Sequence, residues 1–286
     1  MNLRNWAAGV AVGAAAEGIR RREVESIGVT HRDISLPCWP KVLDGFRIVV
    51  ASDLHIHPAA TRMGRRERRL AELLASLDCD AFVSPGDLCN TAAAARVAVD
   101  VVRASSPRYG RFITLGNGEH KRCEETTPII RTLRRAGHVL MNDNVAIEVN
   151  GTPVWFLGVD DPSQDYDRLD AAALGVPSGA PRILLAHSPE IVTRLHRAPV
   201  DLVICGHTHG GQVCPPNGRA LWTQTATLER ASLGYGEYGP EDFARFNGHD
   251  LSRTRMFVSR GVGTAKLAIR AFCRPEVAAL TLWNAA

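Results

Sequence analysis

The chain has no Cys-x-x-Cys pair, although it contains seven cysteines in 286 residues. Scattered cysteines in odd number indicate neither a disulfide framework nor a zinc ribbon, and they favour a reducing compartment. Aromatic residues make up only 6% of the chain, and none lies within the arginine-rich segment 62–69. Single-strand grooves need such aromatics for stacking, and a net charge of +4 is mild, so no specific nucleic-acid binding is expected.

The chain also lacks an apolar run long enough to cross a bilayer. The apolar segment 6–16 has 11 residues, whereas a transmembrane helix needs about 20. Arginines precede and follow this segment, which leaves two interpretations open, a signal peptide or an anchor at the membrane surface. We expect residues 1–43 to form an N-terminal, membrane-proximal extension. The expected location is cytoplasmic and peripheral at the inner membrane, with a periplasmic location as the alternative.

Polar residues with metal-ligand chemistry recur after short apolar runs that are rich in β-branched residues. Five such runs are predicted strands, and the clusters that follow them are Ser52-Asp53-Leu54-His55, Gly86-Asp87, Gly116-Asn117, His187 and Gly206-His207-Thr208-His209. Open α/β sheets bind their ligands at the carboxyl ends of strands. Because extended backbone repeats its side-chain direction every second residue, we expect His207 and His209 to point the same way. The same alternation would align Asp53, His55 and His57.

The clusters supply seven candidate metal ligands with carboxylate, amide and imidazole groups. They are Asp53, His55, Asp87, Asn117, His187, His207 and His209. Mixed oxygen and imidazole donors suit Mn, Fe or Zn better than Ca or Mg. Seven ligands are too many for one ion and indicate two ions that share a carboxylate. Taken alone, His187 would fit an interior histidine and Asn117 a turn residue, but five clusters in order favour a metal site.

In this order, the motifs resemble those of the calcineurin-like metallophosphoesterases from about residue 44 onward. The Gly-His-Thr-His-Gly-Gly-Gln form and the later Val-Ser-Arg-Gly-Val-Gly are similar to a bacterial, often membrane-associated branch. The resemblance implies a hydrolase of phosphoric ester bonds. Such an enzyme is a dinuclear, metal-dependent phosphoesterase that cleaves phosphodiester or pyrophosphate bonds by attack of a metal-bound hydroxide. The expected substrate is a phosphate ester, lipid- or nucleotide-linked.

The resemblance also implies a role for each ligand. Asp53, His55 and His209 would hold the first ion, and Asp87 would bridge the two. The ligands of the second ion would be Asn117, His187 and His207. Two divalent ions are expected, with Mn as the leading candidate and Fe or Zn as alternatives.

One position departs from the family's pattern. The fourth motif of the family usually reads Gly-Asn-His-Asp or Gly-Asn-His-Glu, and its histidine helps to protonate the leaving oxygen. Here the slot holds Gly118, which carries no acid. His120 and His57 are the candidate catalytic acids in its place, and we expect slow turnover or a preference for good leaving groups.

Two alternative functions remain open on the sequence. A narrower enzyme would be a UDP-2,3-diacylglucosamine pyrophosphatase of lipid A synthesis. A different class would be a catalytically weak metal-binding scaffold, which Gly118 makes conceivable and which the intact ligand set argues against.

Arginines cluster directly after the first metal motif, and leucines follow them at helical spacing. Leu70, Leu73, Leu74 and Leu77 predict an amphipathic helix. The arginines are either a solvated helix face or a positive rim for phosphate or anionic lipid. On the second interpretation, Arg65 and Arg66 would bind substrate, and peripheral membrane contact is expected.

The order of predicted elements indicates an α/β fold. Strands and helices alternate early, strands dominate later, and a four-layer αββα sandwich of two mixed β-sheets accommodates both. Residues 44–286 are expected to form one metallophosphoesterase domain, in which the long excursion 213–255 could cover the cleft. Asp160 and Asp161 predict a turn. Further predicted helices cover 127–136 and 166–174, and further predicted strands cover 183–186, 200–205, 256–259, 268–272 and 277–282.

Overall fold

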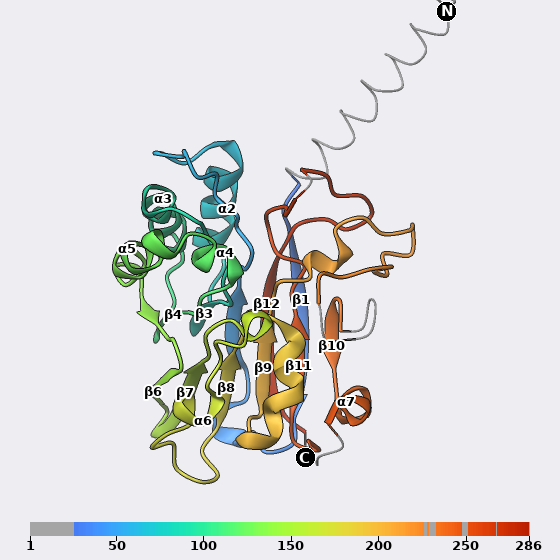
Figure 1. The fold of residues 1–286 in the computed structure, drawn as a ribbon. Helices are drawn as coiled ribbons and strands as arrows, with labels where there is room; N and C mark the ends of the chain where they lie inside the picture. Colours follow the sequence, from blue (N-terminus) through green and yellow to red (C-terminus); the bar gives the residue numbers. More distant parts are fainter. Residues whose placement is uncertain (1–25, 226–227, 229–232, 248–250, 267, 286) are drawn as a thin grey trace, which may run out of the picture.

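The protein is known from a computed structural model, which describes residues 26–225, 228, 233–247, 251–266 and 268–285. These residues form two six-stranded sheets with helices on their outer faces (Figure 1). The apolar segment 6–16 lies outside the described residues, and so do parts of the excursion 213–255. Within the described chain, no helix combines the length and the apolar character that a membrane span requires.

The first sheet has the strand order β1-β12-β2-β3-β4-β5. Strands β2 to β5 run parallel to one another, whereas β12 is antiparallel to β2 and parallel to β1. The strands are β1 (Gly28–Leu36), β2 (Phe46–Val50), β3 (Ala81–Ser84), β4 (Gly110–Ile113), β5 (His138–Val139) and β12 (Glu276–Asn284).

The second sheet has the order β10-β11-β9-β8-β7-β6. Its four central strands are parallel, and β10 and β6 are antiparallel edges. The strands are β6 (Asp143–Val149), β7 (Thr152–Gly158), β8 (Arg182–Leu185), β9 (Leu202–Cys205), β10 (Gly236–Tyr238) and β11 (Arg255–Val258). Both sheets are therefore mixed, as the sequence predicts.

The central strands of each sheet are buried on two faces, which explains why they are apolar. Between the sheets, Ile48 and Phe112 of the first pack with Phe156 and Ile204 of the second. The rings of Phe112 and Phe156 stack with centroids 3.9 Å apart. Separate apolar clusters join the outer faces to the helices, so the predicted αββα sandwich is confirmed.

The helices cover the outer faces of the two sheets. Leu70 and Leu74 of α2 are buried, which confirms the amphipathic helix. The α-helices are α2 (Arg65–Ser76), α3 (Ala92–Arg103), α4 (Asn117–His120), α5 (Cys123–Leu133), α6 (Leu169–Ala172) and α7 (Pro240–Asn247). The 3₁₀ helices are η1 (Lys41–Leu43), η2 (Pro162–Gln164), η3 (Pro189–Arg197) and η4 (His209–Gly211).

Four parts of the chain differ from what the sequence predicts. Helix α5 begins and ends a few residues before 127–136, and α6 is a single turn inside 166–174. The predicted strand 268–272 is wrong, because this segment forms a loop with one bridge, Val213 to Ala271. Strand β1 pairs with β12 along its whole length, so part of the expected extension 1–43 is an edge of the first sheet.

Candidate metal centre

The seven candidate ligands converge from loops at the carboxyl ends of parallel strands. Asp53 and His55 follow β2, Asp87 follows β3, and Asn117 opens α4 after β4. His187 follows β8 of the second sheet, and the pair at 207 and 209 follows β9. The two sheets therefore each contribute one side of a common centre.

The ligand loops are not extended, so the expected alternation of side chains is wrong here. Five ligands have left-handed backbone, with φ of 52° at Asp53, 43° at His55, 55° at Asp87, 68° at His207 and 51° at His209. Strands β2 and β9 end at residues 50 and 205, before these residues begin. Each such conformation costs on the order of 1 kcal/mol or more, and clusters of them are typical of functional sites.

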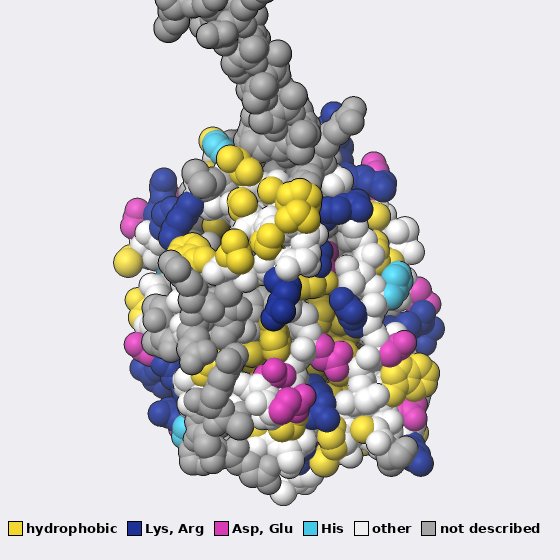
Figure 2. Space-filling model, turned by 90° about the vertical axis from the view of Figure 1, so that its right-hand side faces the viewer, with side chains coloured by type: hydrophobic (Ala, Val, Ile, Leu, Met, Phe, Trp, Pro, Cys, Tyr) yellow, Lys and Arg dark blue, Asp and Glu magenta, His cyan; other side chains and the backbone are white. Residues whose placement is uncertain are grey.

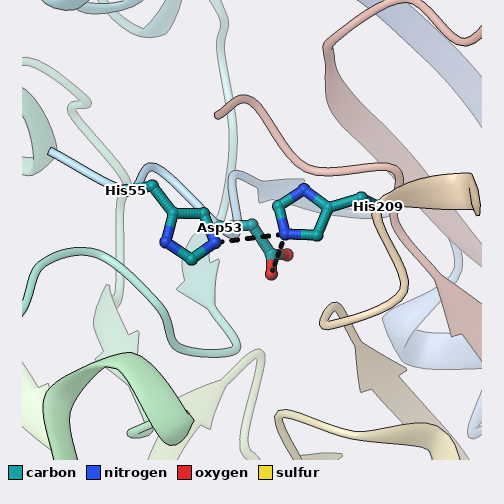
Figure 3. A group of neighbouring side chains, drawn as sticks. All are labelled: Asp53, His55 and His209. Atoms are coloured by element: carbon teal, nitrogen blue, oxygen red, sulfur yellow. Dashed lines mark hydrogen bonds and ion pairs between the residues drawn. The ribbon is translucent and has the colours of Figure 1, made fainter. Parts of the chain in front are cut away.

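The first group of ligands brings together Asp53, His55 and His209. The two imidazoles face each other across the Asp53 carboxylate, His55 from the loop after β2 and His209 from the segment after β9 (Figure 3). Their Nε2 atoms are 3.1 Å apart, and His209 Nε2 lies 3.6 Å from Asp53 Oδ1. All three side chains can offer one ligand atom to a single ion.

The second group lies on the other side of Asp87. Asn117 Oδ1 is 3.2 Å from His187 Nε2 and 3.1 Å from His207 Nδ1, and these two nitrogens are 3.1 Å apart. Asp87 reaches both groups, since Oδ2 lies 3.4 Å from His55 Nε2 and Oδ1 lies 3.5 Å from His187 Nε2. One carboxylate thus faces imidazoles of both groups.

The buried carboxylates of Asp53 and Asp87 dominate the electrostatics of the centre and favour positive charge beside them. Burial lowers the pKa of His187, but Asp87 and Asp53 outweigh it and raise that pKa to about 9. Burial raises the pKa of Asp87, but the histidines at 187 and 55 outweigh burial and lower this pKa below its usual value. Burial also lowers the pKa of His207 and lowers the pKa of His209 well below its usual value, so these two imidazoles are neutral.

The donor set fits divalent ions. His187 Nδ1 lies 2.8 Å from the carbonyl oxygen of Pro85, which can only accept, so Nδ1 carries a proton. The raised pKa places the second proton of His187 on Nε2, which then donates to the Asn117 oxygen at 3.2 Å. A divalent ion can replace that proton and use both Nε2 and the Asn117 oxygen as ligands. Neighbouring ligand atoms 3.1–3.6 Å apart suit a shell with bonds of about 2.0–2.2 Å.

The sequence model described as "Calcineurin-like phosphoesterase" matches residues 46–211, more than half of the chain. The chain belongs to the calcineurin-like phosphoesterases. It is thus a member of a family of hydrolases that act on phosphoester bonds.

Similar proteins within the family come from animals and bacteria. A bovine (Bos taurus) transmembrane protein with a metallophosphoesterase domain is 28% identical over 66% of this chain, and the chain spans about half of its length, 46%. The uncharacterized metallophosphoesterase YkuE of Bacillus subtilis is 25% identical and is matched over 98% of this chain and 96% of its own. The phosphodiesterase YaeI of Escherichia coli is 29% identical over 60% of this chain and 57% of its own.

Gly118, which stands where the family usually has a histidine, packs closely against Asp87. Its backbone N–H donates to Asp87 Oδ1 at 2.6 Å. A Cβ at Gly118 would lie 2.8 Å from the same oxygen, closer than such atoms approach. In this calcineurin-like phosphoesterase, any side chain at 118 would therefore displace Asp87 or the start of α4.

The two candidate acids lie in different surroundings. His120 Nε2 is 2.6 Å from Asp160 Oδ1, and its ring meets Tyr166 edge-on. The hydrogen bond to Asp160 raises the pKa of His120, so this side chain keeps its proton to higher pH than a free imidazole. His57 lines the cleft and is exposed, and its Nδ1 accepts from Ala59 N at 3.3 Å. Asp160 precedes the turn at Pro162, and its carboxylate faces the candidate acid.

The ligands open into a cleft of about 1050 Å³ with a cationic rim. Arg62, Arg66, Lys121 and Lys266 line it. Arg66 also braces the ligand loop, because its Nη2 donates to Leu54 O at 2.8 Å and to His55 O at 3.4 Å. Arg65 is exposed on α2. Substrate binding by Arg65 and Arg66 stays a prediction. The structure gives Arg66 a second role, because its hydrogen bonds support the loop that carries His55.

Glu119 is a functional residue that the sequence did not single out. Its buried carboxylate accepts four backbone N–H groups, from Asp87 (3.0 Å), Leu88 (2.7 Å), Cys89 (3.0 Å) and Gly116 (2.9 Å). Burial and the neighbouring Asp87 raise the pKa of Glu119 to about 7. Glu119 thus connects the Asp87 loop to the start of α4. The sequence signal for this role was its position in the motif Gly-Asn-x-Glu, two residues after the ligand Asn117.

Arg270 is a second residue that the sequence did not reveal. Its guanidinium is 1% exposed and donates to backbone carbonyls of Arg260 (2.7 Å), Gly263 (2.6 Å) and His209 (3.3 Å). This buried cation holds three loops around His209, which explains why 268–272 is a loop. No short motif marks such a residue, because its partners are far apart in sequence.

Proposed function

We propose that this calcineurin-like phosphoesterase is a dinuclear metal-dependent enzyme that hydrolyses phosphodiester or pyrophosphate bonds. The observation that carries the proposal is Asp87, whose two oxygens face His55 of one ligand group and His187 of the other. We assign Asp53, His55 and His209 to the first ion, and Asn117, His187 and His207 to the second. Mn is the leading candidate, with Fe and Zn as alternatives.

The two ions, when bound, would lower the pKa of a coordinated water and neutralise charge on the phosphoryl oxygens. The chain's own residues would bind, orient and protonate the substrate. Lys121 and Lys266 at the cleft face the anionic ester. His120, whose pKa is raised by Asp160, is the candidate donor to the leaving oxygen, and His57, which lines the cleft, is the second.

Substrate and location form part of the same proposal. A lipid- or nucleotide-linked phosphate ester fits the cationic rim of the cleft. We propose that the protein contacts the inner membrane peripherally from the cytoplasmic side. The arginines of α2, several of which are exposed, would bind its anionic lipids.

The test is the variant Asp87→Asn. It keeps the size of the side chain and removes the charge that both groups share. We expect loss of at least one ion in elemental analysis and a fall of about two orders of magnitude or more in hydrolysis of bis-p-nitrophenyl phosphate. Asp170→Asn, on the exposed face of α6, is the matched control and should leave both quantities unchanged. Two ions and normal turnover in Asp87→Asn would remove the assignment.

The same protein distinguishes the alternatives. Reconstitution with Mn, Fe, Zn, Mg or Ca, followed by a panel of mono- and diesters, separates an enzyme from a metal-binding scaffold, which would hold ions and hydrolyse nothing. Cleavage of UDP-2,3-diacylglucosamine in preference to simple diesters would support the narrower pyrophosphatase.

A further inference from the structure

Beside the cleft lies a smaller groove with exposed apolar walls. Its volume is about 270 Å³, and Val213, Leu221 and Trp222 line it. These side chains are 49%, 67% and 51% exposed, respectively. Large apolar side chains that are exposed together along a concave surface are typical of a binding site.

The groove opens directly from the metal-centre cleft. Gln224, Ala265 and Lys266 line both cavities, so a molecule held in the cleft can continue into the groove. Lys266 Nζ lies 5.8 Å from the centroid of the Trp222 ring. A cation thus stands where the polar cleft meets the apolar groove, which suits an anionic group joined to an apolar one.

Hydrogen bonds between the two walls hold the groove open. The Gln212 side chain pairs twice with Ala265, donating to its carbonyl at 3.2 Å and accepting from its N–H at 2.9 Å. Val213 bridges to Ala271, and Cys214 N donates to the Ala271 carbonyl at 2.9 Å. These bonds fix the side of the groove that carries Val213, so this side needs no ordering before a ligand binds.

The apolar surface extends beyond the groove. Ile269 and Phe272, on the segment bridged to Val213, are 38% and 55% exposed. Figure 2 views the molecule from the side where this loop region lies in Figure 1, and it shows hydrophobic side chains gathered on that face with Lys and Arg beside them. An aliphatic chain would find continuous contact there.

We infer that this groove binds the aliphatic chain of an amphiphilic phosphoester, while Lys266 and the metal centre hold its phosphate. The inference rests on the proposed function, since it takes the cleft as the phosphate site. It names the substrate class, a phosphate ester with an alkyl or acyl tail.

The test uses n-alkyl phosphates from methyl to octyl, below their micelle concentrations, as inhibitors of bis-p-nitrophenyl phosphate hydrolysis by the reconstituted enzyme. Each methylene that enters the groove should tighten binding up to about fourfold. Three buried methylenes would therefore lower the inhibition constant about 60-fold relative to methyl phosphate. A constant that does not change with chain length would overturn the inference.

Variants locate the effect. Leu221→Ser and Trp222→Ser change exposed side chains. Each should reduce the octyl-to-methyl ratio, the factor by which octyl phosphate binds more tightly than methyl phosphate, to less than about threefold, because the apolar wall is lost. Leu174→Ser alters an apolar side chain that is 78% exposed elsewhere and is the matched control, with an unchanged ratio. A ratio that survives both groove variants would place the tail elsewhere and contradict the inference.

Two further measurements separate other outcomes. Calorimetric titration of octyl and methyl phosphate reports on the groove without turnover, so tighter octyl binding that vanishes in Leu221→Ser supports it even if the protein hydrolyses no ester. Sedimentation with phosphatidylglycerol vesicles tests a membrane as the occupant. Loss of vesicle binding in Leu221→Ser with an unchanged octyl-to-methyl ratio would replace the inference with a membrane contact.

Discussion

Glu119 shows how much a single buried carboxylate controls in this site. It is fully buried and does not line the cleft, yet it accepts the N–H groups of the Asp87 loop and of Gly116. Partners of this kind fix the direction in which a metal ligand points. We therefore regard Glu119 as a positioning residue for Asp87.

We predict that Glu119→Gln weakens metal binding about 10–100-fold, because one oxygen that accepts two N–H groups becomes an amide donor. A competitive titration with a chromophoric chelator would measure it. Glu125→Gln is the control, since Glu125 accepts a single N–H, that of Ala92 at 2.9 Å. Equal metal affinities for the two variants would contradict the positioning role.

At the residue scale, the sequence predicted the ligand types and missed what supports them. Asp87 and His187 were recognisable because each follows an apolar run and carries metal-ligand chemistry. The left-handed backbone of Asp87 and of four other ligands was not predicted, because the strands stop before the ligands begin. Arg270 was out of reach, since its role depends on contacts across loops.

At the scale of the elements, Asp201 joins three parallel strands of the second sheet. Its buried carboxylate accepts from Arg182 N of β8 at 2.8 Å and from Arg253 Nε at 3.0 Å. Its own carbonyl accepts from Arg255 N of β11 at 2.9 Å. The amino ends of β8, β9 and β11 thus meet at one residue, through both its side chain and its backbone.

We expect Asp201→Ala to lower the free energy of unfolding by about 1–3 kcal/mol, because it removes the buried acceptor of the Arg182 N–H and of Arg253. Asp78→Ala removes an exposed ion pair with Arg47 (2.6 Å) and should cost less than about 1 kcal/mol. Urea unfolding of both variants compares them directly. Similar losses for the two would show that burial does not strengthen the Asp201 pair.

Element types were easier to predict than element ends. The central strands β2, β3, β8 and β9 are short and apolar because they are buried on two faces, and that pattern is visible in sequence. Segment 268–272 looked the same, but there the buried Arg270 replaces strand pairing with side-chain bonds to backbone carbonyls. Periodicity alone does not distinguish these two cases.

At the scale of the whole molecule, the metal centre lies between the two sheets. Asp53, Asp87 and Asn117 follow strands of the first, and the histidines at 187, 207 and 209 follow strands of the second. Bound ions would therefore link the halves of the domain, and their binding energy would add to its stability.

We predict that Mn at about 100 times its dissociation constant stabilises the chelator-treated protein by about 2.7 kcal/mol. The midpoint of thermal unfolding should rise by about 5 °C. Differential scanning calorimetry with and without EDTA measures the shift, and Asp87→Asn should abolish most of it. The same shift in that variant would mean that the ion binds elsewhere.

The first sheet also has a consequence for biosynthesis. Strand β12 lies between β1 and β2, and Thr30 of β1 bonds to Glu276 across 246 residues of chain. While a ribosome is still translating the middle of the chain, β2 has no neighbour on that side, and β1 has nothing to pair with. An open strand edge of this kind invites association with other nascent chains. Such a protein completes its first sheet only late in synthesis, and its yield in cells should depend on chaperones that shield that edge.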